Sequence, residues 1–251
     1  MELTNNLRKT IASLNQPKMR RETGWFVAEG TKCVLETLGA FRLEYLIGTR
    51  EWLDEHSDVA RCCICAPQSE INRMSQLKTP QPVIAVYEIP GDPFISPAIS
   101  NELVIALDRV QDPGNMGTII RIADWFGIRT ILAEECADVY NPKVVQASMG
   151  SIARVKVAYV DLYHTLTDLS EYMPIYGTFL NGKNIYEADL TPNGIIVMGN
   201  EGKGISRMVA ETVNSPLFIP PFPGDSPTAE SLNVGVATAI TVAEFRRRIK
   251  I

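Results

Sequence analysis

Three short segments toward the C-terminus place glycine and polar side chains where an apolar, strand-like pattern changes into a helical one. They read DPGNMGTIIRIAD (112–124), VMGNEGKGIS (197–206) and FIPPFPGDSPTAESLNVGVATAI (218–240). Open α/β folds bind ligands in the crevice outside the carboxyl ends of their parallel strands. The three junctions therefore predict one composite site, built from parts of the chain that are distant in sequence.

Around these segments, short apolar runs alternate with helical patterns. ELVIALD (102–108) is a continuous apolar run, which is typical of a parallel strand covered on both faces. The alternation favours an α/β fold with a mostly parallel sheet. The expected strands are 102–108, 129–133, 153–160, 174–180, 194–199 and 215–220, and the clearest helices are 116–126 and 231–248.

Residues 1–90 are expected to form a separate, small α/β domain. Its leading helix is expected over 3–15, where leucine and isoleucine recur at helical spacing, and Pro17 is expected to end that helix. The proline-rich segment 91–100 predicts a linker to a second domain, 101–251, because proline restricts its own backbone and that of the preceding residue. Further strands are expected at 26–29, 43–49, 61–66 and 82–89, with helices near 31–40, 50–56 and 68–78.

The composition argues against membrane and metal functions. Hydrophobic residues at 45% and charged residues at 21% are ordinary for a globular enzyme. The chain has no apolar run of the ~20 residues that a membrane helix needs, and its start lacks the apolar core of a secretory signal, so we expect a cytoplasmic protein. Five cysteines without ligand spacing favour a reduced core strand around Cys62, Cys63 and Cys65 over a metal or redox site.

Basic residues gather at both ends of a chain whose net charge is −5. The overall charge argues weakly against a nucleic-acid partner, but the local distribution matters more. Lys18, Arg20 and Arg21 are candidate contacts to phosphate near the N-terminus. The C-terminal run, 246–248 with Lys250, is adequately explained by the end of a helix, where cations are favourable.

The first segment allows two explanations. Asn115 can cap the following helix or present a polar group to a ligand. Arg121 falls among apolar helix positions, and arginine is rarely buried without a partner. The structural explanation is an ion pair with Asp108 or Asp124, and the functional explanation is contact with a ligand.

The other two segments add polar residues at further strand ends. The second departs from the phosphate-loop order GxxxxGK[ST] and from GxGxxG, so a nucleotide-phosphate site is disfavoured. Its Glu201 is either a solvated turn residue or a group that faces the crevice. In the third, Ser231 suits a helix N-cap, whereas Asn233 is less easily explained inside the first turn because asparagine is a mediocre helix former. Gly235 weakens that helix, which is tolerable where backbone must approach something closely.

Together and in this order, the segments resemble motifs one to three of the SpoU (TrmH-type) RNA ribose methyltransferases of the SPOUT superfamily. The pattern is N-x-G-x-x-x-R, then G-N-E-G-x-G, then I-P followed by S-L-N-V-x-V-A. The resemblance covers roughly residues 101–248. More loosely, FVAEGTKCVLETL (26–38) is similar to the opening of the small substrate-binding domain that often precedes the catalytic domain.

This resemblance implies a fold, a reaction and partners. The fold is a mostly parallel α/β domain with a deep C-terminal trefoil knot. The reaction is transfer of a methyl group from S-adenosylmethionine, without a metal, to a ribose 2′-hydroxyl in structured RNA, and the N-terminal domain favours ribosomal over transfer RNA. The family works as homodimers with the site near the subunit interface. The alternatives are a transfer-RNA enzyme, an inactive RNA-binding protein of the same fold, and an enzyme with a small-molecule substrate.

The resemblance also assigns residue roles. Arginine is a poor general base because it stays protonated, so we expect Arg121 to orient a phosphate or stabilise the developing alkoxide, whereas the family proposal makes it the proton acceptor. The 224–231 loop looks longer than the family form, and Gly235 stands where a small hydroxyl residue is usual. Lys18, Arg20 and Arg21 become candidate RNA contacts. The implied catalytic residues are Arg121, Asn115, Glu201, Ser231 and Asn233, and the implied cofactor-binding residues are Thr178, Met198, Gly199, Ile219 and Leu232.

Overall fold

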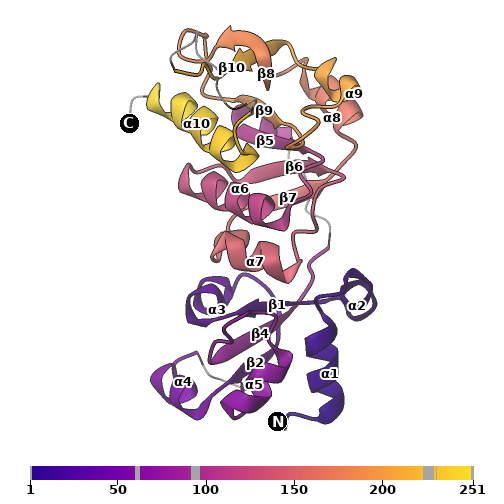
Figure 1. The fold of residues 1–251 in the computed structure, drawn as a ribbon, viewed down its shortest axis with the longest axis vertical. Coiled ribbons are helices and arrows are strands. Elements are labelled where there is room, and N and C mark those ends of the chain that lie inside the picture. The colour runs from indigo at the N-terminus through magenta and orange to yellow at the C-terminus, as the bar shows by residue number, and fades with distance from the viewer. Residues whose placement is uncertain (1, 60–62, 92–96, 223–228, 230, 250–251) are drawn as a thin grey trace. The chain divides into compact units, whose positions relative to one another are not determined.

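The structure is a computed structural model, and it describes residues 2–59, 63–91, 97–222, 229 and 231–249. The chain divides into two compact units (Figure 1). The first contains Met1–Gly91 together with Asp138–Arg154, and the second contains Asp92–Ala137 together with Val155–Ile251. The predicted division differs here, because it placed Asp138–Arg154 in the second domain, 101–251.

The first unit is built on a mixed four-stranded sheet. Its elements are α1 (Asn5–Ser13), α2 (Pro17–Thr23), β1 (Trp25–Glu29), α3 (Thr31–Thr37), β2 (Leu43–Gly48), α4 (Arg50–Glu55), β3 (Cys63–Cys65), α5 (Gln68–Met74), β4 (Val83–Glu88), α7 (Pro142–Ser148) and the 3-10 helix η2 (Ser151–Ala153). The strands lie in the order β1-β4-β2-β3, where β4 is antiparallel to β1 and β2, and β2 is parallel to β3. Ile11 of α1, Ile47 of β2 and Ile71 of α5 share its core. The small α/β domain expected here is confirmed.

The start of the chain contains one helix more than the sequence predicted. α1 begins where the Thr4 side chain accepts a hydrogen bond from the Leu7 amide at 3.2 Å. Pro17 follows the end of this helix, as expected, but it is also the first residue of α2. Proline suits the first turn of a helix because the N–H that it lacks would have no intrahelical acceptor there.

The cysteine-rich strand is less buried than expected. In β3, Ile64 is buried, but Cys63 is half-buried and Cys65 is exposed, because β3 is an edge strand of its sheet. Cys62 lies outside the described residues. Cys33, on α3, is buried instead, and burial raises the pKa of its thiol to about 11. Among the residues that the structure describes, the cysteines are free and no group of His, Cys, Asp or Glu could hold a metal ion.

Arg20 is a structural residue, which corrects its prediction as an RNA contact. Its side chain is only 1% exposed. Nε and one terminal nitrogen donate to Oδ2 of Asp138 at 2.9 and 2.5 Å. The other terminal nitrogen donates to the carbonyls of Leu14 and Asn15 at 2.8 and 3.1 Å. Arginine is rarely buried unless it is paired, and here the protein itself supplies every partner.

The second unit is built on a six-stranded sheet. Its elements are the 3-10 helix η1 (Pro97–Asn101), β5 (Leu103–Asp108), α6 (Pro113–Trp125), β6 (Thr130–Glu134), β7 (Lys156–Tyr159), α8 (Leu162–Leu169), β8 (Ile175–Asn184), β9 (Gly194–Met198), α9 (Arg207–Ala210), β10 (Ser215–Phe218) and α10 (Val234–Arg247). The strands lie in the order β10-β8-β9-β5-β6-β7, and the neighbouring pairs are all parallel. The expected α/β fold with a mostly parallel sheet is confirmed. No helix within the described ranges is both long enough and apolar enough to span a bilayer.

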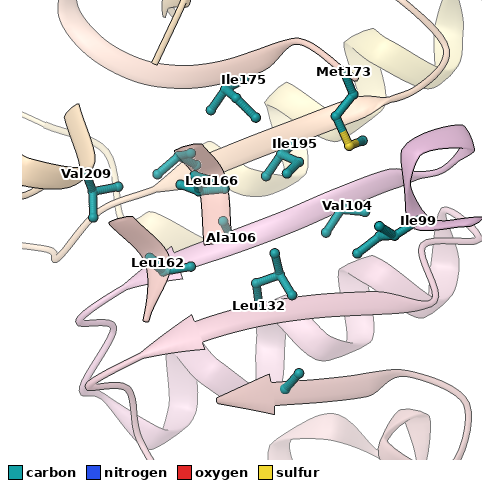
Figure 2. Packing of buried hydrophobic residues seen from close by; sticks show 12 residues of the cluster. Ile99, Val104, Ala106, Leu132, Leu162, Leu166, Met173, Ile175, Ile195 and Val209 are labelled. Atoms are coloured by element: carbon teal, nitrogen blue, oxygen red, sulfur yellow. The ribbon is translucent and has the colours of Figure 1, made fainter. Parts of the chain in front are cut away.

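Apolar side chains cover the central strands of this sheet on both faces. β5 and β9 are buried at every residue. Val104 and Ala106 of β5 and Ile195 of β9 pack with Leu162 and Leu166 of α8 in one cluster (Figure 2). Successive side chains of a strand point to opposite faces, so the alternate residues of β5 and β9 are buried on the other side. This two-sided burial explains the continuous apolar runs of the sequence.

Two strands of the second unit approach each other at very short range. A Cβ added to Gly182 of β8 would lie 2.4 Å from the carbonyl carbon of Leu217 in β10, so only glycine fits there. The pairing register of these strands shifts between Pro216 and Leu217. The expected trefoil knot depends on the path from β10 to α10, and residues 223–228 and 230 of that path lie outside the described ones. The knot and the longer loop therefore stay predictions.

The basic run at the end of α10 binds the protein itself. Arg248 donates to the carbonyl of Ile185 at 2.9 Å, and Nε of Arg246 donates to the carbonyl of Phe126 at 2.9 Å. Arg247 forms an ion pair with a glutamate one turn earlier in the helix. These contacts, rather than phosphate, account for the C-terminal arginines.

We expect the Arg20→Ala variant to lose about 2–3 kcal/mol of unfolding free energy. The substitution leaves buried carbonyls without donors and removes the ion pair with Asp138, whose carboxylate is partly exposed and can be rehydrated. Urea denaturation followed by circular dichroism measures the loss. Arg21→Ala is the matched control, because Arg21 is exposed on the same helix and its removal should cost less than about 0.5 kcal/mol. Equal stability of the two variants would contradict the structural role of Arg20.

We expect the stabilisation by Glu244 of α10 to disappear in acid. Hydrogen bonds from Arg247, and then from Arg248, hold the pKa of this carboxyl at about 2, below its ordinary value of 4.5, although burial opposes them. The carboxylate therefore stabilises the fold above about pH 4.5, and this contribution is lost as the pH falls toward 2. Glu244→Gln should lower Tm at neutral pH, with an effect that shrinks across that window in thermal denaturation. A difference in Tm that stays constant with pH would refute this.

Candidate active site

The two central strands bring the first two segments together. β5 and β9 are neighbours, with Leu107 opposite Met198, so the chain leaves the sheet at adjacent points. The first segment then starts α6, where Oδ1 of Asp112 accepts a hydrogen bond from the Asn115 amide at 2.8 Å. Asp112 is the N-cap. Asn115 therefore lies in the first turn of the helix, and its side chain is left for other contacts.

The second segment forms a tight turn directly after β9. The backbone N–H and carbonyl of Asn200 pair with those of Gly204 at 3.0 and 2.9 Å, and Oδ1 of Asn200 accepts from the Gly202 amide at 3.0 Å. A Cβ on Gly199 would lie 2.3 Å from the carbonyl carbon of Gly204, so the two backbones touch. Glu201 stands in this turn and is half-buried.

The third segment places Asn233, not Ser231, at the N-cap of α10. Oδ1 of Asn233 accepts from the amides of Gly235 and Val236 at 3.0 and 3.3 Å. This corrects the expectation that Ser231 caps the helix, and it explains Asn233 without invoking a weak helix former inside a turn. The close approach expected at Gly235 is confirmed, because a Cβ there would lie 3.3 Å from the Thr118 side chain of α6.

Side-chain hydrogen bonds connect the three segments. Nδ2 of Asn115 donates to Oε1 of Glu201 at 2.8 Å, and Nδ2 of Asn233 donates to Oδ1 of Asn115 at 2.9 Å. The side-chain amide of Asn115 thus donates one hydrogen bond and accepts another, and it connects Glu201 to Asn233. The structure brings together three of the five residues predicted as catalytic, one from each segment.

The other two predicted catalytic residues do not join these contacts. Arg121 is exposed on α6, and its side chain makes no hydrogen bond or ion pair with any residue that the structure describes. An ion pair with Asp108 is wrong as its structural explanation, because Asp108 is buried and pairs with Arg109 at 2.9 Å. Ser231 is likewise exposed.

Four of the five residues predicted to bind the cofactor lie in or directly after three neighbouring strands, β8, β9 and β10, and the fifth lies just before α10. Thr178 comes directly after the last residue of β8 that pairs with β9, and its Oγ1 lies 3.8 Å from Sδ of Met198, which is buried at the end of β9. Gly199 is the next residue, and Ile219 follows β10. Leu232 precedes the N-cap of α10 and is 47% exposed.

Two titratable groups at the end of β6 have pKa values that burial raises, which favours their neutral forms. Cys136 donates to the Leu107 carbonyl at 3.2 Å, and burial raises the pKa of its thiol to about 11, so it is no thiolate nucleophile at neutral pH. Burial, with the nearby Asp161, also raises the pKa of Glu134. Neither group is part of the contacts among the three segments.

The candidate RNA-binding residues that remain belong to the first unit. Lys18 and Arg21 are both exposed on α2, and Nζ of Lys18 lies 3.7 Å from the carboxylate of Glu22. Exposed pairs of this kind hold a side chain only weakly, so Lys18 stays available to a partner.

A parallel-sheet domain whose polar residues gather beyond the carboxyl ends of its strands belongs to the class of α/β folds that bind ligands in that region. Residues 102–243 match the model of the SpoU rRNA Methylase family, and residues 5–85 match that of the MRM3-like substrate binding domain. The first match alone spans more than half of the chain. The chain belongs to the SpoU rRNA Methylase family.

Individual relatives agree over nearly the full length. The chain is 30% identical to the 23S rRNA (guanosine(2553)-2'-O)-methyltransferase RlmP of Bacillus subtilis (strain 168), over 95% of each chain. Among solved structures, one assigned to the TrmH family of RNA methyltransferases, from Porphyromonas gingivalis, has 41% identity and a TM-score of 0.88 over 98% of this chain and 99% of that one. An AdoMet-bound rRNA methyltransferase from Sinorhizobium meliloti has 27% identity and a TM-score of 0.84 over 100% and 99%.

Proposed function

We propose that this protein methylates a ribose 2′-hydroxyl of ribosomal RNA, with S-adenosylmethionine as the methyl donor. The observation that carries the proposal is the chain of hydrogen bonds from Glu201 through Asn115 to Asn233, because it joins the three segments by which the sequence resembles the family. The Bacillus relative is named for the 2′-O-methylation of 23S rRNA. The match of residues 5–85 to a substrate binding domain supports a large substrate.

The residues present fit S-adenosylmethionine, which the Sinorhizobium relative holds in its solved structure. The segments that carry the predicted cofactor residues also expose the apolar side chains of Leu180, Phe222 and Leu232, at 75%, 96% and 47%. Apolar surface of this kind at the ends of parallel strands suits an adenosine ring. When bound, the cofactor supplies an electrophilic methyl group on its sulfonium.

The residues of the chain supply orientation and charge. Methyl transfer requires the hydroxyl oxygen to approach the methyl group in line, so positioning provides much of the rate acceleration. The carboxylate of Glu201 and the amides of Asn115 and Asn233 form a fixed set of acceptors and donors for the ribose. The guanidinium of Arg121 orients a phosphate or stabilises the alkoxide that develops as the hydroxyl loses its proton.

A homodimer is part of the proposal. Six residues of helix separate Arg121 from Asn115, about 9 Å along the axis, so one chain alone leaves Arg121 apart from the connected residues. Trp125 of α6 is 84% exposed and Val236 of the adjoining α10 is 49% exposed. A second copy packed on these helices would cover the apolar surface and lie beside Arg121. Sedimentation equilibrium that returns the mass of one chain would refute the dimer.

The RNA contacts are assigned to Lys18 and Arg21, and the site of action to the cytoplasm, where an enzyme of ribosomal RNA meets its substrate. Cations that contact phosphate make binding weaker as salt rises, in proportion to the number of contacts. Filter binding of the double alanine variant over a range of salt tests the assignment. If RNA affinity depends on salt in the variant as it does in the wild type, neither residue contacts phosphate.

Ribose-methylation mapping of total RNA, from cells with and without the gene, tests the function. A 2′-O-methyl group that is lost from ribosomal RNA and restored by the purified protein with labelled S-adenosylmethionine supports the proposal. Loss from transfer RNA instead would show that the substrate is wrong and the reaction right. If calorimetry detects no binding of S-adenosylmethionine, and the methylation map is the same with and without the gene, the inactive RNA-binding alternative is favoured instead.

We expect Arg121→Ala to reduce methyl transfer by at least about 10²-fold, the loss typical when a group that stabilises developing charge is removed. Arg121→Lys keeps the positive charge but not the planar donors, so it should retain only part of the activity. A labelled-methyl assay with the mapped RNA measures both variants. Because Arg121 is exposed, neither change should lower Tm appreciably. Normal turnover in both variants would refute every role considered for this residue.

A further inference from the structure

The turn that carries Glu201 is attached to the end of β5 at two points. One attachment is at Asn200, immediately before Glu201, and the other is at Ser206, two residues after the turn closes, where α9 (Arg207–Ala210) begins. β5 also leads into the helix that carries Asn115. Both partners of the Glu201–Asn115 hydrogen bond are therefore held by the same strand.

Asp108, the last residue of β5, makes the attachment to Ser206. Its side chain is 1% exposed. Its carboxylate accepts from the Ser206 amide at 2.5 Å and from Nε of Arg109 at 2.9 Å. An isolated buried carboxylate is strongly unfavourable, so these hydrogen bonds offset its desolvation and make the contact costly to break.

Asn200 makes the second attachment. Its Nδ2 donates to the carbonyl of Arg109 at 2.8 Å, while its Oδ1 accepts from the amides of Gly202 and Lys203 at 3.0 and 3.1 Å. Arg109 has a φ of +59°, a left-handed conformation that is unfavourable for a non-glycine residue. Its own amide donates to the Glu134 carbonyl at 2.9 Å. Such strain persists only where the surrounding contacts determine the conformation.

We propose that Asp108 and Asn200 are positioning residues that hold Glu201 against Asn115. The inference rests on the proposed function, because it gives catalytic value to that hydrogen bond. Each residue acts through the turn and needs no contact with substrate. Reacting groups must be held within about 0.5 Å of the productive geometry. The internal hydrogen bonds of the turn fix its shape but not its position, so attachment to β5 determines where the turn places Glu201.

Two substitutions at Ser206 separate the role of its amide from that of its side chain. Ser206→Pro removes the amide hydrogen that Asp108 accepts, and the backbone φ of −63° already suits proline. Ser206→Ala keeps the amide, and the hydroxyl makes no capping hydrogen bond, so this variant is the matched control. We expect kcat to fall about 10²-fold in Ser206→Pro, as for a 1 Å misplacement, and to stay within about twofold of wild type in Ser206→Ala.

Asn200→Asp tests the other attachment. The variant keeps the oxygen that accepts from Gly202 and Lys203 but loses the donor to the Arg109 carbonyl. We expect kcat to fall at least about tenfold, with KM for RNA and S-adenosylmethionine affinity within about threefold of wild type. A merely structural role would lower Tm and leave the kinetic constants of the folded protein unchanged, and that result would overturn the proposal.

A double-mutant cycle decides whether Asn200 acts through Glu201. Adding Asn200→Asp to Glu201→Ala should reduce kcat by less than about twofold further, because the group being positioned is already absent. Losses that multiply would show that the two residues act independently and would overturn the proposal.

A measurement without catalysis separates this inference from the proposed function. The Asn115 side-chain amide donates to Glu201, so its nitrogen-15 NMR signal reports their contact directly. In the Asn200→Asp and Ser206→Pro variants, this signal should move toward the chemical shift that it has in the Glu201→Ala variant. In the Ser206→Ala variant it should keep its wild-type chemical shift. An unmoved signal in Asn200→Asp overturns the inference, whatever the folding of the proline variant. A shifted signal in a protein whose wild type methylates no RNA keeps the inference and refutes the proposed function.

Discussion

The parallel pairing of β5 with β9 at the centre of the second sheet determines where the rest of the site can lie. Both strands are buried on both faces, so their register is fixed by the core. With Leu107 opposite Met198, the residues that follow each strand emerge side by side. Asn115 and Glu201, 86 positions apart in sequence, are within hydrogen-bond distance for this reason.

The third part of the site depends on helix packing instead of strand pairing. α10 lies against α6, and Gly235 allows its first turn to approach Thr118. That contact places Asn233, which caps α10, within reach of Asn115. Asn233 therefore both caps α10 and donates a hydrogen bond to Asn115, so the stability of α10 and the geometry of the site are coupled.

Much of the fold could be predicted because hydrophobic periodicity is local. β5 and β9 lie within one residue of their expected bounds, and both are the most continuous apolar runs. The strand expected over 153–160 begins only at Lys156, because alternation in sequence does not distinguish it from the preceding turn of 3-10 helix. β8 runs to Asn184, beyond the expected end, through a pairing with β10 whose register shifts. Pairing of that kind depends on distant residues and leaves no local signal.

By itself, the sequence determined which residues follow each strand, and therefore the three segments, the family they resemble and the residue types at the site. Only the tertiary structure decided which polar groups the protein itself uses. Arg20 pairs with Asp138, and Asn233 with Asn115, each across 118 positions of the chain. Burial and partnership arise from contacts between segments that are remote in sequence, so one arginine of the basic N-terminal cluster is structural while its neighbour Arg21 is exposed.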